Sequence, residues 1–498
     1  MNGSSMLRRM LRPFAGMQLK NPGRLAISLY RTFLDKRPVE LIAPGCNAAK
    51  AGKIRYRKVI IGMFRANVSS SFLDLYLYSA LKNAGVNVKV ILCDGSTFPC
   101  DAIAADGNIF NYRCMECKST QQRFSTLIDS ADIIRPRRIT ALSVKAPNRN
   151  VIASAKRFDK MESGFDEKIA AKYQNTYDSV IDLLKDQRDV DLIIMSHGMY
   201  ASWGAMRDYC QDRGIDFITW GRSYFDKMIA VVKNSTINEG VNDLYADLPI
   251  AHPEELEKLV GSLTSRVSGN KAKNDTVDYY AYLGDRASEP ETTLDRISSS
   301  AGKTVAIYLS IPWDGTVYGA NGEFGSQKDF IRCILNSARM RADILFVFRV
   351  HPMEHAEKEK AIDQIRALAG DELPNVVVVD SHAKLTSYQL MKVAQLNIVY
   401  SGTLALEIAY AGFPLVVCGR NLSSNFSGIT TASTAEEIES IWSSDFSTHA
   451  PRDVTTLLTN LSKTLYVDDL TVSDTFDVTS FKQDSHLVQR VMDELIYE

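Results

Sequence analysis

The residues best suited to chemistry end a strongly apolar run in the C-terminal half of the chain. Arg349, His351 and Pro352 close the run Ile344–Val350. Arg349 and His351 alternate along an extended segment, so their side chains can point to the same side. A guanidinium and an imidazole together can neutralise a monophosphate or diphosphate, and the proline stiffens the turn that follows. This motif predicts a phosphate-binding site.

A second polar motif lies about 50 residues further along the chain, after another short apolar run. Ser401, Gly402 and Thr403 come directly after Leu396–Tyr400 and precede a helical pattern. Small hydroxyl and glycine residues at a helix start leave N–H groups facing outward, where the helix dipole also favours a phosphate. Glu407 lies about one and a half turns into this helix, and its carboxylate can accept hydrogen bonds from ribose hydroxyls. N-capping alone also explains part of the pattern.

The elements that position these motifs are predicted strands of a parallel sheet. Apolar runs rich in Val, Ile and Phe (Ile344–Val350, Val376–Val379 and Leu415–Val417) alternate with helical stretches. Ser387 begins one of these helical stretches and belongs to the predicted ligand-binding set. In an open α/β sheet, ligands bind at the carboxyl ends of the strands. The sequence therefore predicts a nucleotide site at this edge.

A similar pattern opens the N-terminal half. Val59–Phe64 and Val86–Gly95 are predicted to be buried strands, with the helical stretch Phe72–Ala84 between them. Asp191–Tyr224 repeats the order of strand, loop, helix and strand. Strands that alternate with helices in this way favour a doubly wound sheet. The predicted fold class is therefore α/β, with two doubly wound domains.

Two residues are candidates for a general base. His197 follows a buried strand in a glycine-containing loop, and an ordinary imidazole titrates near neutral pH. Capping of the next helix by His197 is an alternative that the sequence leaves open. Asp314 lies in the loop Ile311–Gly325, where a carboxylate can also accept a proton.

Cysteines cluster in the N-terminal half, at Cys93, Cys100, Cys114 and Cys117. The last two have C-x2-C spacing, and four thiolates can hold a structural zinc ion. Only one pair has that spacing, however, and Cys93 lies inside a predicted strand. Ordinary buried thiols are the favoured interpretation, and a structural metal is the alternative.

The composition is that of a globular protein in a reducing compartment. Of 498 residues, 45% are hydrophobic and 23% charged, with 58 basic and 59 acidic side chains. This balance argues against nucleic-acid binding, and no apolar run approaches the ~20 residues of a membrane-spanning helix. The 8 cysteines without a secretory signal favour the cytoplasm. A basic amphipathic pattern near the N-terminus fits either docking on the protein itself or contact with the inner face of a membrane.

The length favours more than one domain, with a polar connector between two α/β halves. The predicted divisions are an N-terminal basic amphipathic extension at 1–57, a Rossmann-like acceptor domain at 58–250, a connector at 251–302, a Rossmann-like nucleotide-sugar domain at 303–480 and a C-terminal helix at 481–498.

The chain resembles bacterial capsule and surface polysaccharide biosynthesis proteins of the GT-B glycosyltransferase type, whose two Rossmann-like domains face a cleft. The resemblance rests on the strings IPWDGTVYG, FRVHP and LTSYQLMKVAQLNIVYSGTLALEIAYAGFPLVVCGR. It implies that the donor phosphate is bound by Arg349, His351, Ser401, Gly402 and Thr403. It also implies that Glu407 binds the ribose. The chain lacks the D/E-D/E-G base motif of the similar sialyltransferases.

The predicted function is a glycosyltransferase that moves a sugar from a CMP-, CDP- or UDP-linked donor to a surface glycan or a lipid-linked glycan. The acceptor is expected on the first domain, with the reaction in the cleft and no metal cofactor. A nucleotide-sugar 2-epimerase and a non-catalytic polysaccharide assembly or export factor are the alternatives.

Overall fold

The chain folds into two compact α/β units. The computed structural model describes residues 54–65, 68–100, 112–140, 143, 145–159, 166–223, 225, 228–236, 253–268, 297, 302–311, 324, 326–352, 354, 360–369, 373–383, 385–419, 423–424, 426–467 and 486–496. Contacts assign the described residues to unit 1, within Met1–Arg222, Ile229–Ile237 and Val467–Glu498, or to unit 2, within Ser223–Met228 and Asn238–Tyr466. The predicted amphipathic N-terminal helix lies outside the described residues.

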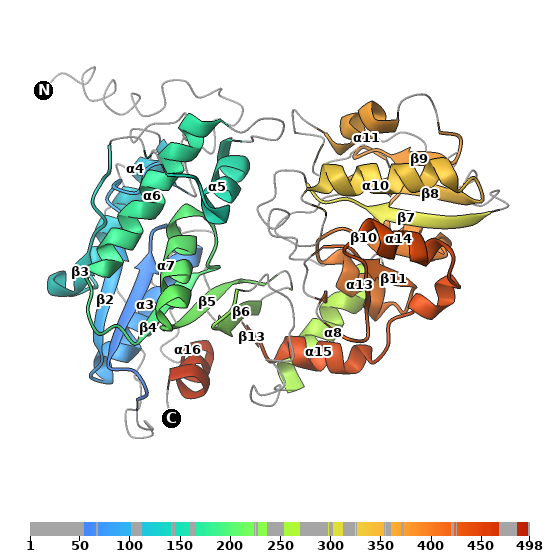
Figure 1. Ribbon diagram of the computed structural model, residues 1–498. Coiled ribbons are helices and arrows are strands. Elements are labelled where there is room, and N and C mark those ends of the chain that lie inside the picture. Colours follow the sequence, from blue (N-terminus) through green and yellow to red (C-terminus); the bar gives the residue numbers. More distant parts are fainter. Residues whose placement is uncertain are drawn as a thin grey trace, which may run out of the picture. The chain divides into compact units, whose positions relative to one another are not determined.

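Unit 1 is built on a seven-stranded sheet in the order β3-β2-β1-β4-β5-β6-β13 (Figure 1). Its strands are β1 Lys58–Met63, β2 Asn87–Leu92, β3 Ile133–Ile134, β4 Leu192–Ser196, β5 Asp216–Arg222, β6 Met228–Lys233 and β13 Leu465–Val467. Strands β1 to β5 pair in parallel, and β6 is antiparallel to β5. The order changes direction between β1 and β4, which makes this point the topological switch of unit 1.

Helices cover both faces of the first sheet. They are α3 Val68–Asn83, α4 Tyr112–Ser125, α5 Arg149–Asp159, α6 Glu167–Lys185, α7 Tyr200–Arg213 and α16 His486–Val491, which continues as the π-helical turn Met492–Ile496. On one face, side chains of α6 and α7 form a common core with strands β1 and β4, and α5 packs on both helices. On the other face α3 packs against β1 and β2 and contacts α16.

Unit 2 has a six-stranded sheet in the order β12-β11-β10-β7-β8-β9. Its strands are β7 Lys303–Tyr308, β8 Ile344–Arg349, β9 Val376–Val379, β10 Leu396–Val399, β11 Leu415–Val417 and β12 Thr430–Thr431. All neighbouring pairs are parallel. Counted within the unit, this is the order 3-2-1-4-5-6 of a Rossmann fold, with its switch point between β7 and β10.

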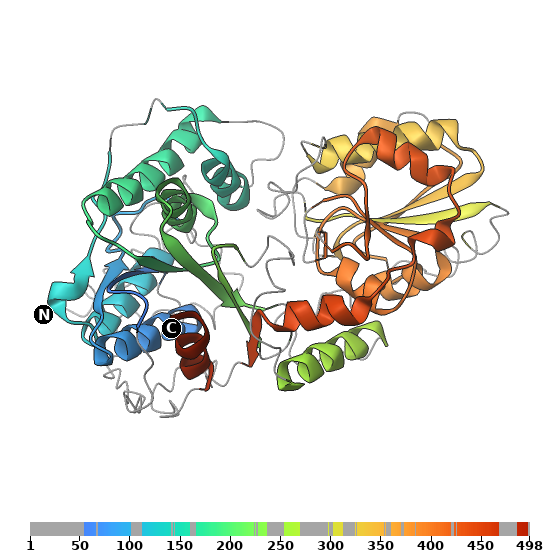
Figure 2. The same cartoon turned by 60° about the horizontal axis from the view of Figure 1, so that its bottom comes forward.

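The second sheet is also covered on both faces. Its helices are α8 Pro253–Val267, α10 Gln327–Met340, α11 Ala361–Ala369, α12 Ser387–Val393, α13 Leu404–Tyr410, α14 Ala435–Trp442 and α15 Val454–Ser462. Helices α10, α11 and α14 share one core with the strands. Helices α12 and α13 contact β7, β10 and β11, and α8 packs on α13 and α15. Figure 2 shows α8 (light green) beside α15 (red-orange).

The strand order confirms the predicted fold class of two doubly wound α/β halves. Ile344–Arg349 forms a strand because its continuous apolar run is buried on both faces, as in a parallel sheet. The predicted domain boundaries and the cleft stay predictions. Helix α8 lies inside the predicted connector, yet it packs on unit 2. Among the described residues, no helix combines the length and apolar character needed to span a membrane.

Candidate active site

The residues predicted to bind the nucleotide-sugar donor lie at one edge of the unit 2 sheet. Strand β7 lies between β10 and β8, and all three run parallel. The residues that follow them, Ser310, Ser401 and His351, therefore come out at the same edge, on either side of the switch point. The Ser310 hydroxyl donates a 2.8 Å hydrogen bond to the Ser401 carbonyl oxygen. This bond joins the loops after β7 and β10 where a Rossmann fold binds its ligand.

Ser310 is itself fixed by Gln327, the first residue of α10. The side-chain oxygen of Gln327 accepts from the Ser310 N–H at 2.8 Å, and its amide nitrogen donates to the Ser310 carbonyl oxygen at 3.0 Å. Both residues are buried. The sequence motifs do not include this pair, although Ser310 directly follows the apolar run of residues 304–309, which is a signal that could have found half of it.

Arg349 is buried more deeply than we expect for a residue that binds a phosphate. Its exposed fraction is 1%. Its guanidinium donates to the carbonyl oxygens of Val379, at 3.4 Å, and Asp380. These hydrogen bonds connect the end of β8 to the loop after β9. A direct contact between Arg349 and a phosphate stays a prediction.

His351 is the more accessible member of the motif. It is half-buried, two residues beyond the end of β8, while Pro352 is buried. Burial and the neighbouring Arg349 guanidinium lower the pKa of His351 to about 4. The imidazole is therefore neutral at pH 7, and it can offer a ligand a hydrogen bond but no positive charge.

The serine–glycine–threonine loop brings polar groups to the switch point. Ser401 is buried, whereas Gly402 is exposed and has φ 120°, a backbone conformation that favours glycine. Thr403 is the N-cap residue of α13, but its side chain makes no capping hydrogen bond. Capping, the alternative reading of this motif, therefore does not use the Thr403 hydroxyl.

Two further predicted donor residues are buried in unit 2. Ser387 is the first residue of α12, whose N-terminus is closed by a capping box between Thr386 and Gln389. Glu407 lies on α13, and its carboxylate forms an ion pair with Arg266 of α8 at 2.9 Å. Arg266 comes from the predicted connector, and no local pattern around it predicts a contact with this carboxylate.

The switch point of unit 1 also carries polar residues. Arg65 follows β1 and is exposed, and His197 follows β4 and is half-buried. The His197 ring lies between Tyr200 and Trp203, at centroid distances of 5.4 and 4.6 Å. Tyr200 has φ 66°, which is strained for a residue with a side chain. Such strain clusters at functional sites, so this loop is the candidate ligand-facing region of unit 1.

The hydrogen bonding of His197 bears on its predicted role as a base. The backbone N–H of Met199 donates to His197 Nδ1 at 3.3 Å. Burial and the nearby Arg65 guanidinium lower the pKa of His197 to about 3. The ring is therefore neutral at pH 7, and its proton lies on Nε2. In this arrangement His197 offers a ligand a donor, and it can act as a base only if Nδ1 is released from the Met199 amide.

Replacement of Gly198 by alanine is expected to destabilise unit 1 by about 2–4 kcal/mol. Gly198 has φ 62°, and an added Cβ would lie 2.9 Å from Cγ2 of Thr219. Gly214 is the matched control, because it has φ 66° with no atom within 4 Å of its added Cβ. Gly214→Ala should cost only the backbone penalty, about 1–2 kcal/mol. Urea unfolding of both variants measures the difference, and equal losses would contradict the proposed steric contribution.

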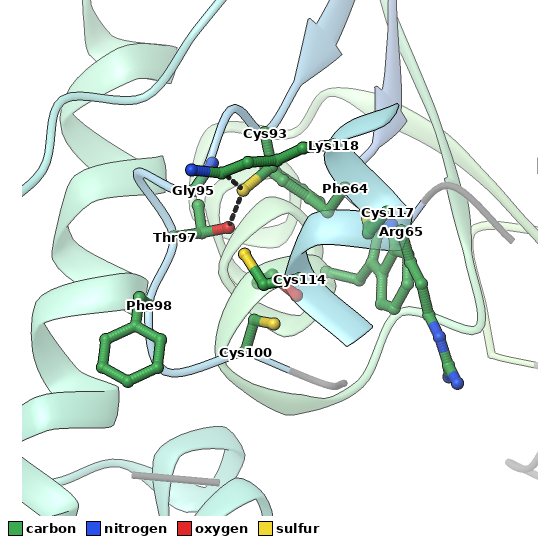
Figure 3. A pocket seen from close by; sticks show the side chains of 12 residues that line it. Phe64, Arg65, Cys93, Gly95, Thr97, Phe98, Cys100, Cys114, Cys117 and Lys118 are labelled. Atoms are coloured by element: carbon green, nitrogen blue, oxygen red, sulfur yellow. Dashed lines mark hydrogen bonds between the residues drawn. The ribbon is translucent and has the colours of Figure 1, made fainter. Parts of the chain in front are cut away.

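The four clustered cysteines line a pocket beside the ends of β1 and β2 (Figure 3). About 470 Å³ of space there is free of atoms, part of it open to solvent. Cys93 Sγ accepts hydrogen bonds from Thr97 Oγ1 at 2.8 Å and from the Gly95 N–H at 3.3 Å. The side chain of Lys118 passes beside Gly95 (Figure 3).

A structural metal at these thiols stays a prediction. Cys114 and Cys117 lie three residues apart on helix α4, instead of on the tight turn of a zinc knuckle. Among the described residues, no group of three or more His, Cys, Asp or Glu side chains is placed to hold a metal ion. Cys93 and Cys100, the other two members of the predicted cluster, are free thiols, as are Cys114 and Cys117. Asp314, the other predicted base, lies outside the described residues.

Comparisons with known proteins give weak structural likenesses. No protein-family model and no curated protein matches the chain. A KpsC of Thermosulfurimonas dismutans, described as a beta Kdo 2,4 transferase, is 11% identical with a TM-score of 0.34, over 56% of this chain and 80% of that chain. A UDP-GlcNAc 2-epimerase of Neisseria meningitidis is 14% identical with a TM-score of 0.24, over 82% of this chain and 97% of that chain. A UDP-GlcNAc 2-epimerase of Methanocaldococcus jannaschii is 10% identical with a TM-score of 0.28, over 78% of this chain and 92% of that chain. At these scores the likenesses carry no argument about activity.

Proposed function

We propose that the protein is a glycosyltransferase that binds a nucleotide-sugar donor on unit 2 and a surface glycan or lipid-linked glycan acceptor on unit 1. The observation that carries the proposal is the bond between Ser310 and Ser401 at the switch point of a Rossmann-type sheet. Polar groups from three adjacent strands meet at the edge where such sheets bind nucleotides. The polysaccharide assignment of the acceptor rests on the sequence resemblance.

The proposed reaction needs stabilisation of a departing nucleotide. An acceptor hydroxyl attacks the anomeric carbon of the donor sugar, and the bond from that carbon to the phosphate oxygen breaks, leaving negative charge on the nucleotide. A neutral His351 donates a hydrogen bond to a phosphate oxygen, and the Gly402 and Thr403 loop supplies backbone N–H groups. Asp314 is the candidate that takes the proton from the acceptor hydroxyl, while His197 orients the acceptor through Nε2–H.

The proposal needs no metal ion bound to a D-x-D motif. Asp189 and Asp191 form the D-x-D of the chain, and they precede β4 at the amino edge of the unit 1 sheet. The Asp191 carboxylate accepts from the N–H groups of Arg57, at 2.8 Å, and Lys58, at 2.9 Å. These bonds give Asp191 a structural role at the amino edge of its sheet, opposite the carboxyl edge where such sheets bind ligands.

Calorimetric titration with CMP, CDP and UDP tests donor binding. We expect one of them to bind with a dissociation constant in the micromolar range, about −8 kcal/mol. The matching nucleotide sugars should then release nucleotide only when a glycan acceptor is present. Conversion of the donor without an acceptor would instead identify a 2-epimerase. If no nucleotide binds, the enzyme proposal fails in favour of an assembly or export factor.

A further inference from the structure

The ion pair between Arg266 and Glu407 joins two distant parts of unit 2. Arg266 Nη1 lies 2.9 Å from Glu407 Oε1, although 141 residues separate them in the sequence. The exposed side-chain fractions are 10% for Arg266 and 4% for Glu407. The Arg266 guanidinium also lies 5.9 Å from the ring centroid of Phe225. Both charges are therefore largely withdrawn from water.

Stability alone is a poor explanation for this pair. Taking two charges out of water costs about as much as their attraction returns, so a buried ion pair adds little net stability. Helix α8 has other attachments, because Leu259 and Leu263 are fully buried and the Thr264 hydroxyl lies 2.6 Å from the Tyr410 hydroxyl of α13. The helix can therefore stay in place without the ion pair, which points to a task for Arg266 other than anchoring.

That task follows from the position of Glu407. Glu407 lies on the first turn of α13, directly after the loop of Ser401, Gly402 and Thr403. Arg266 Nη1 bonds to Oε1 and so restricts the orientation of the carboxylate. Among the described residues, Oε2 takes part in no hydrogen bond. One carboxylate oxygen thus remains to accept from a ligand.

We propose that Arg266 is a positioning residue that holds Glu407 so that its second oxygen accepts hydrogen bonds from the ribose hydroxyls of a bound nucleotide. The inference rests on the proposed function, since it assigns a part of the same donor site. The site then selects ribonucleotides, because a nucleotide without the 2′- and 3′-hydroxyls leaves the fixed carboxylate without its partners.

Calorimetric titration of the best-bound ribonucleotide and of its 2′,3′-dideoxy counterpart tests the role of Arg266. The wild-type protein should bind the ribonucleotide about 10- to 100-fold more tightly. Glu407→Gln and Arg266→Met should each reduce this preference to less than about threefold. Arg266→Lys should retain an intermediate preference, since an ammonium keeps the charge without the planar fork. Tyr410→Phe removes the neighbouring contact between α8 and α13, and it should leave the preference unchanged.

The double variant Arg266→Met with Glu407→Gln separates positioning from a merely structural role. If Arg266 acts through Glu407, the double variant should show the same preference as Glu407→Gln alone. It also avoids leaving an unpaired buried charge, so it stays informative if Arg266→Met does not fold. An undiminished preference in a folded Arg266→Met protein would overturn the inference. Equal binding of both nucleotides by the wild-type protein would also overturn the inference, but it would leave the proposed donor site standing. If the wild-type protein binds no nucleotide, the proposed function itself is overturned.

Discussion

Replacement of His351 by alanine is expected to lower kcat/KM for sugar transfer by about 100-fold while leaving the fold intact. His351 lies just beyond β8, beside the switch point of unit 2, where the departing phosphate is proposed to lie. Burial and Arg349 lower its pKa to about 4, so the wild-type imidazole acts at pH 7 through a hydrogen bond. His351→Asn keeps a donor on a shorter side chain and should recover part of the loss. Steady-state rates of nucleotide release measure the effect.

His449→Ala is the matched control within unit 2. His449 is half-buried between the hydroxyls of Ser444, at 2.8 Å, and Thr430, at 3.2 Å. His449 belongs to the 3-10 helix Phe446–His449, so it is not one of the residues that follow β7, β8 and β10 at the candidate site. His449→Ala should leave transfer unchanged. Unchanged turnover of His351→Ala, with a thermal transition like that of the wild type, would refute the assignment of His351 to the donor site.

The pH dependence of turnover gives the same assignment a second test. Because the pKa of His351 lies near 4, its protonation occurs only well below neutrality. The rate should therefore show no ionisation of His351 between pH 5.5 and 8. A fall in rate near pH 6.5 that disappears in His351→Asn would show that the imidazole titrates at its ordinary pKa during catalysis.

The fold could be predicted because its signals are local. A parallel strand covered on both faces needs a continuous apolar run, and residues 344–348 of β8 and Leu415–Val417 of β11 have such runs. Helices α12 and α14 begin at capping boxes whose two residues are only three positions apart in the sequence. Since strands and helices alternate, the parallel order follows from the sequence of elements.

The candidate site was predictable only in part, because its contacts are long-range. Sequence alternation places Arg349 and His351 on one side, but it carries no information on depth, and only the structure shows the Arg349 guanidinium bonded to backbone carbonyls. The partner of Glu407 lies in a stretch that resembles a connector. Ser310 and Ser401 are 91 residues apart and meet only because β7 and β10 are neighbours.

Glu354 is a buried carboxyl that the sequence did not single out. It follows His351 by three residues, and its exposed fraction is 0%. Its Oε2 accepts a 2.8 Å hydrogen bond from the Ala361 N–H at the start of α11. Its Oε1 is buried without a hydrogen-bond partner among the described residues. Burial, together with the Asp380 carboxylate, raises the pKa of Glu354 to about 8, so the folded protein holds a proton there at pH 7.

This proton should make unit 2 less stable as pH rises. In the unfolded chain the Glu354 carboxyl loses its proton near pH 4.5, whereas in the folded chain it keeps it up to about 8. The contribution of the protonated Glu354 carboxyl to the free energy of unfolding is therefore complete below pH 4.5. This contribution is lost progressively as pH rises toward 8. The expected loss is about 3 kcal/mol between pH 4.5 and 7. Glu354→Gln keeps a carbonyl oxygen for Ala361 and removes the titration, so this part of the pH dependence should disappear.

Urea titrations at pH 6 and pH 8 measure the effect, with the unfolded fraction of unit 2 read from β8 peptides after a short deuterium pulse. Wild-type unit 2 should lose about 2–3 kcal/mol over this range, and Glu354→Gln should lose much less. Burial also raises the pKa of Asp74 in unit 1, so peptides of β4 serve as the internal control by comparison of the two proteins: because Glu354 belongs to unit 2, they should respond equally to pH in the wild type and in Glu354→Gln. His351 titrates in the opposite sense: its lowered pKa weakens the fold as pH falls from 6.5 toward 4. A wild-type stability of unit 2 that stays level from pH 6 to 8 would mean that Glu354 is ionised in the folded protein, with Oε1 hydrated.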